Sequence, residues 1–254
     1  MAAAPDEPVR VLILGGTGEA AALARRLETE PRVHAITSLA GRTRRPAAIP
    51  GDVRVGGFGG AAGLADYLAR EDVRLVVDAT HPFAAAISQH AAEACRSAGA
   101  PLLRLSRAPW APVAGDRWTE VSDMAAAADA VMRLGRRVFL SVGRQDLPAF
   151  AHMNEVWFLV RTIEPLDGPC PLTSCDLIQG RGPFGEDDES SLLRSHAIDL
   201  VVSKNSGGNA TYPKIAAARG LGLPVVMIER PPALPGDHVE DIEDAVAWIE
   251  ARLD

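Results

Sequence analysis

The chain has 254 residues, of which 47% are hydrophobic and 23% charged, the balance of a globular protein with a buried core. Its formal net charge of −7 excludes a surface that binds nucleic acid throughout, and no apolar run approaches the roughly 18 residues of a membrane span. Residues 1–8 also lack the basic and apolar regions of a secretory signal. We therefore expect a cytoplasmic protein with no nucleic-acid partner and no membrane partner.

Alternating strand and helix signals run along the first half of the chain. Short apolar runs predict buried strands, and apolar positions three and four residues apart predict the helices between them. Strands are expected at residues 9–14, 33–37, 73–78 and 101–105, and helices at 19–27, 59–70 and 83–98. A stretch rich in proline, glycine and alanine follows at 107–116, and we place a domain boundary there.

The same alternation continues after this boundary. Strands are expected at residues 137–142, 156–161, 176–179, 199–203 and 224–228, and helices at 124–134, 186–196, 212–219 and 242–253. Repeated strand–helix units predict parallel sheets flanked by helices. We therefore expect an α/β protein with two Rossmann-like domains, at 1–108 and 109–254, and an active site in the cleft between them. Ligands of such sheets bind at the carboxyl ends of the strands.

The turn after the first strand fits a dinucleotide-binding fingerprint. Gly16, Gly18 and Ala21 match G-x-G-x-x-A between a strand and a helix. The first glycine allows a sharp turn, the second lets the backbone approach a pyrophosphate, and the alanine keeps helix and strand close. The amides and the dipole at the helix start attract the phosphates. The alternative is a glycine turn of some other α/β protein.

The end of the second strand indicates which nucleotide binds. NAD-binding proteins usually place an acid here for the ribose diol. This chain instead has Thr37 and Ser38, followed by Arg42 and Thr43 in a basic loop. Hydroxyls and a guanidinium suit a 2′-phosphate, because arginine offers a planar fork of N–H donors to phosphate oxygens. The sequence therefore predicts NADPH as the cofactor.

Other strand ends also carry polar side chains. Thr80, His81 and Pro82 follow the strand at 73–78, where they would begin a helix beside the glycine turn, and His81 could donate a proton. The run from Ser203 to Asn209 has the composition of an anion-binding loop. Cations in or beside strand ends suggest a ligand with several carboxylates, although ordinary exposed side chains are the alternative. These cations are Arg104, Arg144, Arg161, Arg181, Lys204 and Arg230.

Hydrolytic and metal-dependent chemistry are disfavoured. The sequence has no G-x-S-x-G elbow, no H-E-x-x-H and no paired metal-ligand spacing, so we expect no resident metal. Cys95, Cys170 and Cys175 are expected to be reduced structural thiols.

Several of these motifs together resemble the precorrin-6A reductase family of cobalamin biosynthesis, over nearly the whole chain. The motifs are Gly15-Gly16-Thr17-Gly18-Glu19-Ala20, Ala40-Gly41-Arg42, Asp78-Ala79-Thr80-His81-Pro82-Phe83-Ala84, Gly182-Pro183-Phe184, Ser203-Lys204-Asn205-Ser206-Gly207-Gly208, Lys214-Ile215-Ala216-Ala217-Ala218 and Ile228-Glu229-Arg230-Pro231. Two positions depart from the family pattern: Gln145 stands where many relatives have lysine, and Asn205 where many have aspartate.

The resemblance implies that NADPH transfers hydride to one carbon–carbon double bond of the macrocycle precorrin-6A, giving precorrin-6B, which passes to the next pathway enzyme. The residues expected to hold NADPH are Gly16, Thr17, Gly18, Glu19, Ser38, Arg42, Thr43, Thr80, His81 and Pro82. Those expected to bind the anionic tetrapyrrole are Arg104, Arg144, Lys204, Asn205 and Ser206. Asp146 and His81 are the catalytic candidates, and Asp146 could support a protonated ring nitrogen or relay a proton.

Three other functions stay open at this point. The chain could be a cobalt-precorrin-6A reductase of the anaerobic branch, because metal-free and cobalt-containing substrates leave no distinguishing residue. It could be a different NADPH-dependent reductase or epimerase that acts on a small substrate. It could also be a non-catalytic sensor that binds NADPH and reports redox state.

Overall fold

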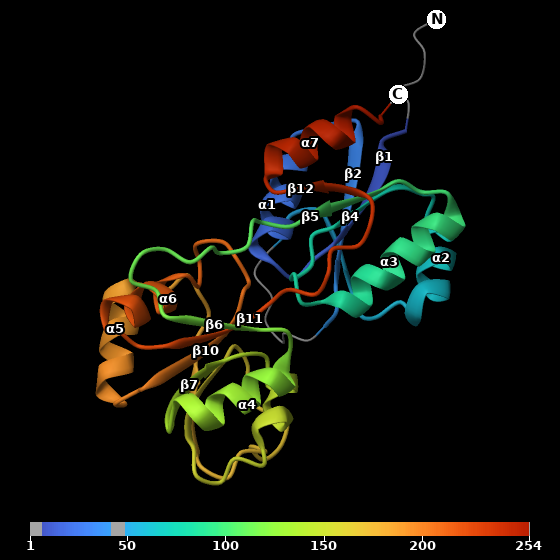
Figure 1. Ribbon diagram of the computed structural model, residues 1–254. Helices are drawn as coiled ribbons and strands as arrows, with labels where there is room; N and C mark the ends of the chain where they lie inside the picture. Colours follow the sequence, from blue (N-terminus) through green and yellow to red (C-terminus); the bar gives the residue numbers. More distant parts are fainter. Residues whose placement is uncertain (1–6, 42–48, 254) are drawn as a thin grey trace, which may run out of the picture. The chain divides into compact units, whose positions relative to one another are not determined.

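The computed structural model describes residues 7–41 and 49–253, and it contains two six-stranded parallel sheets in two compact units (Figure 1). Unit 1 comprises Met1–Arg107 and Pro231–Asp254, and unit 2 comprises Ala108–Arg230. The boundary after residue 107 lies beside the expected one. The continuous second domain expected at 109–254 requires correction, because the last part of the chain returns to unit 1.

The sheet of unit 1 has the strand order of a Rossmann fold. Its order is β12-β5-β4-β1-β2-β3, and all neighbours are parallel. The strands are β1 (Val9–Leu14), β2 (Val33–Leu39), β3 (Asp52–Val55), β4 (Val73–Asp78), β5 (Leu102–Leu105) and β12 (Asp237–Val239). The strand order reverses between β1 and β4, and the crevice at such a switch point is where nucleotides bind.

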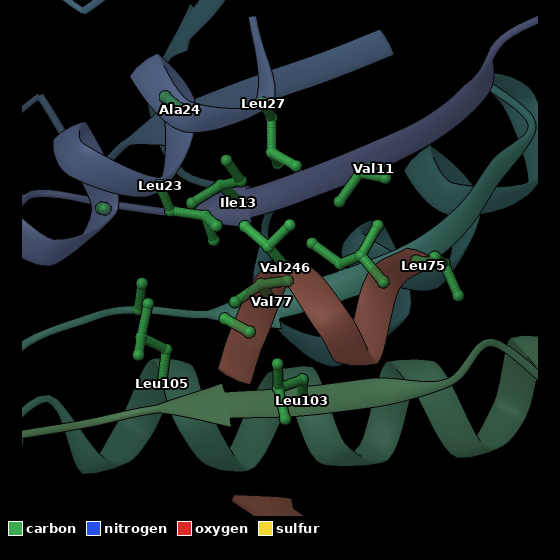
Figure 2. Packing of buried hydrophobic residues seen from close by; sticks show 14 residues of the cluster. Val11, Ile13, Leu23, Ala24, Leu27, Leu75, Val77, Leu103, Leu105 and Val246 are labelled. Atoms are coloured by element: carbon green, nitrogen blue, oxygen red, sulfur yellow. The ribbon is translucent and has the colours of Figure 1, made fainter. Parts of the chain in front are cut away.

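Helices cover both faces of this sheet. The helices are α1 (Gly18–Leu27), α2 (Gly60–Arg70), α3 (Ala85–Ala98) and α7 (Ile242–Glu250). Figure 2 shows how Leu23 and Leu27 of α1 pack with Val246 of α7 over Ile13 and Val77. The opposite face is buried by α2 and α3.

The C-terminal segment completes the sheet and buries an apolar stripe. Asp237 and Val239 of β12 pair with Leu103 and Leu105 of β5. Helix α7 begins at the cap of Asp241, whose side chain accepts a hydrogen bond from the Asp244 amide. The buried Ala245, Val246 and Ile249 of α7 then join the core that contains α1. This burial of apolar surface holds residues 237–250 to unit 1.

Unit 2 repeats the parallel architecture. Its order is β6-β11-β10-β7-β8-β9. The strands are β6 (Trp118–Val121), β7 (Arg137–Ser141), β8 (Trp157–Thr162), β9 (Cys175–Gln179), β10 (Leu200–Lys204) and β11 (Val225–Ile228). The helices are α4 (Met124–Leu134), the 3-10 helix η1 (Arg144–Phe150), α5 (Glu186–Ser195) and α6 (Pro213–Gly220). The order reverses between β7 and β10, which makes the loops after these two strands the candidate ligand site of this unit.

None of the helices within 7–41 and 49–253 has the length and apolar character that crossing a bilayer requires.

Candidate active site

The turn between β1 and α1 is built to accept an anion. Gly16 has a φ of +109°, a conformation that favours glycine, and a Cβ at Gly16 or Gly18 would meet nothing within 4 Å. Thr17 caps α1 by accepting a hydrogen bond of 3.2 Å from the Ala20 amide. The first amides of a helix have no hydrogen-bond partner within the helix. The amides of Gly18 and Glu19 can therefore bind a ligand. The open space above the two glycines gives a diphosphate access to the backbone.

Side-chain hydrogen bonds join this turn to the end of β4. Thr17 Oγ1 donates to the Ala79 carbonyl at 2.6 Å. Thr80 donates to Asp78 Oδ1 from its hydroxyl at 2.6 Å and from its amide at 3.1 Å. These bonds hold the ends of β1 and β4 in a fixed arrangement at the switch point of the sheet.

A shallow surface hollow, the Thr17 hollow, lies at the same switch point. It is lined by Thr17, Glu19, Ala79, Thr80, Pro82, Leu105, Ser106 and Arg107. Glu19 in the first turn of α1 would repel a phosphate, but Arg107 Nη1 contacts its carboxylate at 2.6 Å. The Arg107–Glu19 pair therefore neutralises this charge. Arg107 was missed in the sequence, because its partner is 88 residues away.

A second cation lies at the end of β2, where the nucleotide ribose is expected. Arg54 of β3 is in register with Ser38 of β2, and its guanidinium approaches Ser38 Oγ at 3.4 Å. It also donates to the Gly56 and Gly57 carbonyls and stacks on the Phe58 ring at 3.8 Å. These contacts use only part of the five N–H donors of an arginine and fix its direction. The expected Arg42 and Thr43 lie outside the described residues.

His81 is held in one orientation after β4. Its Nδ1 accepts a hydrogen bond of 3.2 Å from the Phe83 amide. This bond requires an unprotonated Nδ1, so it favours neutral imidazole with its hydrogen on Nε2. His81 stays a predicted cofactor ligand and proton donor.

In unit 2, an ion pair joins the ends of β7 and β10. Lys204 Nζ lies 2.6 Å from Asp146 Oδ2, and the side chains are 17% and 23% exposed. The same Asp146 oxygen accepts from the Gly143 amide at 3.0 Å. The structure therefore brings together the expected catalytic acid and an expected substrate cation at the switch point of this sheet.

Most other cations expected to bind a ligand have protein partners. Arg144 pairs with Asp167 at 2.9 Å and donates to the Pro165 carbonyl, but its side chain is 30% exposed. Arg161 forms a bidentate pair with the buried Glu189. Arg230 donates to the Asn205 and Ser206 carbonyls. The last two are structural, whereas Lys204 and Arg144 lie near the strand ends with exposed parts.

Asn205 has a structural contact in place of the expected ligand contact. Its Oδ1 accepts from the Trp110 amide at 2.8 Å, and its Nδ2 donates to the Trp110 carbonyl at 2.9 Å. Both ends of the amide are thus engaged, and the residue is 8% exposed. Asn205 therefore positions the loop after β10.

The same loop presents Ser206 and needs a glycine next to it. Ser206 is half-buried, and its amide donates to the Lys204 carbonyl at 2.8 Å. Gly207 has a φ of +67°, and a Cβ there would collide with the Ala108 carbonyl and the Arg230 guanidinium. The close packing of Gly207 and the hydrogen bond of the Ser206 amide hold Ser206 beside Lys204.

Arg104, another of the expected cations, lies in unit 1, on β5, and stays a predicted ligand. As to metals, the described part of the chain contains no cluster of three or more His, Cys, Asp or Glu side chains that could hold an ion.

The fold is that of an α/β protein with two Rossmann-type parallel sheets. The family described as precorrin-6x reductase CbiJ/CobK matches residues 10–250, so the chain belongs to this family and is an oxidoreductase.

Individual relatives support this assignment. A precorrin-6A reductase of Rhodococcus erythropolis is 51% identical over 241 residues, covering 94% of this chain and 97% of that protein. A cobalt-precorrin-6A reductase of Salmonella typhimurium is 28% identical over 260 residues, covering 95% and 97%. A solved structure named CobK precorrin-6A reductase has a TM-score of 0.90 and 45% identity, and covers 96% of both chains. This match confirms the expected fold of two helix-flanked parallel sheets.

Proposed function

We propose that this chain reduces precorrin-6A to precorrin-6B in cobalamin biosynthesis, with NADPH as the reductant. The observation that carries the proposal is the 51% identity to a precorrin-6A reductase over 94% of the chain. The 28% identity to a cobalt-precorrin-6A reductase favours the metal-free substrate over the cobalt-containing one.

The first part of the proposal is the nucleotide site in unit 1. The diphosphate would lie over Gly16, Thr17 and Gly18, where the helix amides point and where the turn leaves open space. Thr80 and Pro82 line the adjoining Thr17 hollow, and His81 lies between them in the loop. NADPH supplies the hydride when it is bound, and these residues hold and orient it.

Selectivity for NADPH over NADH is assigned to the end of β2. Ser38 and Arg54 present a hydroxyl and a guanidinium in register, and no acid takes the place of Ser38. A guanidinium binds phosphate through charge-assisted hydrogen bonds that a ribose hydroxyl cannot match. Arg42 and Thr43 stay predicted ligands of the same phosphate.

The second part is the macrocycle site in unit 2. Lys204, Arg144 and Ser206 are the proposed ligands of the ring carboxylates. Lys204 and Arg144 already contact carboxylates, of Asp146 and Asp167. A substrate carboxylate could exchange with or add to these contacts, because each cation retains further N–H donors.

The Asp146–Lys204 pair is also the proposed proton route. Reduction of a carbon–carbon double bond adds a hydride to one carbon and a proton to its neighbour. The ammonium of Lys204 has transferable hydrogens, and Asp146 holds it in place through the 2.6 Å contact. After donating, Lys204 is neutral and regains a proton from solvent. Asp146 thus positions the acid.

Anaerobic mixing of the protein with NADPH and precorrin-6A tests the proposal, because nicotinamide and macrocycle absorbance can be followed together. Coupled loss of NADPH and a shift of the macrocycle spectrum are expected, and NADH should react more slowly. Binding of NADPH without oxidation by precorrin-6A would refute the proposal. Turnover with the cobalt macrocycle would then support the anaerobic alternative, and no turnover would support a sensor.

A further inference from the structure

Two cysteines of unit 2, Cys170 and Cys175, form a close pair at the start of β9. The Cys175 thiol donates a hydrogen bond to the Cys170 sulfur, and the two Sγ atoms are 2.9 Å apart. The sulfurs of a disulfide are about 2.05 Å apart, so the two atoms need to approach by less than about 1 Å before a bond can form. Both thiols are free and half-buried, which leaves them within reach of a small solute.

The backbone around the pair is held in place. Cys175 begins the edge strand β9 and pairs with Phe158 of β8. Leu172, between the two cysteines, is 6% exposed. Thr173 Oγ1 donates to Asn154 Oδ1 at 2.9 Å, just before β8. These contacts hold the short segment that contains both cysteines, so the approach of the two sulfurs is part of the folded structure.

The two sulfurs differ in reactivity. Burial, followed by the hydrogen bond to Cys170, raises the pKa of the Cys175 thiol to about 12, so Cys175 keeps its hydrogen near neutral pH. Only a thiolate attacks an oxidant, and Cys170, which accepts the hydrogen bond, is therefore the sulfur expected to react first. An accessible cysteine beside a second one that resolves it is the arrangement of cysteine pairs that undergo reversible oxidation.

We propose that Cys170 and Cys175 are a site of reversible oxidation, at which hydrogen peroxide converts the two thiols into a disulfide. The Cys170 thiolate attacks one peroxide oxygen, the O–O bond breaks, and a sulfenic acid and a hydroxide form. The Cys175 sulfur then attacks the Cys170 sulfur, the S–O bond breaks, and the hydroxyl leaves as water with the Cys175 hydrogen. The hydroxide takes up the proton that Cys170 released, so two thiols and one peroxide give one disulfide and two waters.

The disulfide would staple the loop that connects β8 to β9. The same loop carries Pro165 and Asp167, whose carbonyl and carboxylate contact Arg144 at 3.2 Å and 2.9 Å. The new bond adds a covalent tie to the contacts that already hold the loop, and it removes conformational freedom from the unfolded chain. Oxidation should therefore stabilise unit 2. Formation of the bond requires neither NADPH nor the macrocycle.

Peptide mass spectrometry of the unaltered chain tests the site. The folded chain is treated with hydrogen peroxide, alkylated in urea and digested with trypsin, which leaves both cysteines in the peptide 162–181. This peptide should lose two hydrogens and resist alkylation, and dithiothreitol should reverse both changes. A peptide alkylated on both cysteines after treatment would overturn the proposal. Irreversible oxidation of either sulfur in place of the disulfide would overturn it as well.

Single replacements separate the roles of the two sulfurs. Dimedone, which traps sulfenic acids, should label Cys170 in Cys175→Ser and give little label at Cys175 in Cys170→Ser. The reverse result would overturn the order of attack. Cys95→Ala is the matched control and should form the disulfide as the unaltered chain does. Cys95 lies in unit 1, where burial, followed by the charge of Asp78, raises its pKa to about 12.

Thermal unfolding measures the effect of the bond on the loop. The oxidised chain should melt about 4 °C or more above the chain kept in dithiothreitol. Cys170→Ser should show no such difference after the same treatments, which controls for oxidation elsewhere in the chain. Equal melting temperatures of the two forms, with the disulfide fully formed, would overturn the stapling of the loop.

Discussion

Replacement of Asn205 by alanine should destabilise unit 2 without directly removing a substrate contact. The change deletes hydrogen bonds of 2.8 Å and 2.9 Å to the backbone of Trp110. The site is 8% exposed, so water can replace them only poorly. At about 1 kcal/mol for each bond, the loss is about 2 kcal/mol. A chain of this size then melts about 4–8 °C lower.

Thermal unfolding followed by circular dichroism measures this effect, with Asn209→Ala as the matched control on the same loop. Asn209 is exposed, so its replacement should leave the melting temperature unchanged. NADPH affinity should be unaffected by Asn205→Ala, because this residue is in unit 2. The reasoning is refuted if Asn205→Ala has the same melting temperature as the unaltered chain while its KM for precorrin-6A rises. That result would return Asn205 to the substrate-binding residues.

The surroundings of four other residues lead to further predictions. Arg54→Gln should lower NADPH affinity about tenfold and spare NADH in fluorescence titrations, whereas an equal loss for both would exclude a 2′-phosphate role. Lys204→Met should abolish most turnover and leave the Kd for NADPH unchanged; weakened NADPH binding would contradict the separate sites. Gly207→Ala should cost about 2 kcal/mol or more in unfolding free energy, because φ is +67° and the Cβ collides with backbone, while Gly220→Ala in α6, where nothing lies within 4 Å, should be neutral or stabilising. The Cys95 thiol, with its pKa raised to about 12, should react far more slowly with a thiol reagent at pH 8 in the folded chain than in urea, and equal rates would show that it is not protected.

The interior strands could be predicted from the sequence, as could the edge strand β9, whereas the other three edge strands could not. β1, β4, β10 and β11 are apolar runs because helices cover both of their faces. β3, β6 and β12 lie at the edges of the two sheets, and each of their residues is exposed or half-buried. Without a buried face these strands have no apolar periodicity, so the hydrophobic pattern gave no signal for them.

The return of the C-terminal segment to unit 1 also had no local signal. Helix α7 was expected at nearly its observed position, because its apolar stripe is in the sequence. Its partners are β5 and α1, far away along the chain, and the pairing of Asp237 with Leu103 follows no rule of spacing. The sequence offered one boundary signal, the stretch rich in proline, glycine and alanine at 107–116, so a continuous second domain was expected.

The candidate site also combines features that were predictable from the sequence with features that were not. The glycine turn was predictable, because the conformation of Gly16 and the start of a helix are local properties. The partners of Arg54 and Arg107 depend on strand register and on contacts over long sequence distances, so these cations were missed. Asn205 has the residue type of a ligand, and only its two bonds to Trp110 reveal a structural role.

The most direct test of the central claim is transfer of isotope from the cofactor to the ring. NADPH carrying deuterium at C4, in separate 4R and 4S forms, is mixed anaerobically with precorrin-6A and the protein, and the product is analysed by mass spectrometry. The account predicts that precorrin-6B gains deuterium from one of the two forms, and that the second hydrogen comes from water. A product without deuterium from either form would contradict the assignment of this chain as an NADPH-dependent precorrin-6A reductase.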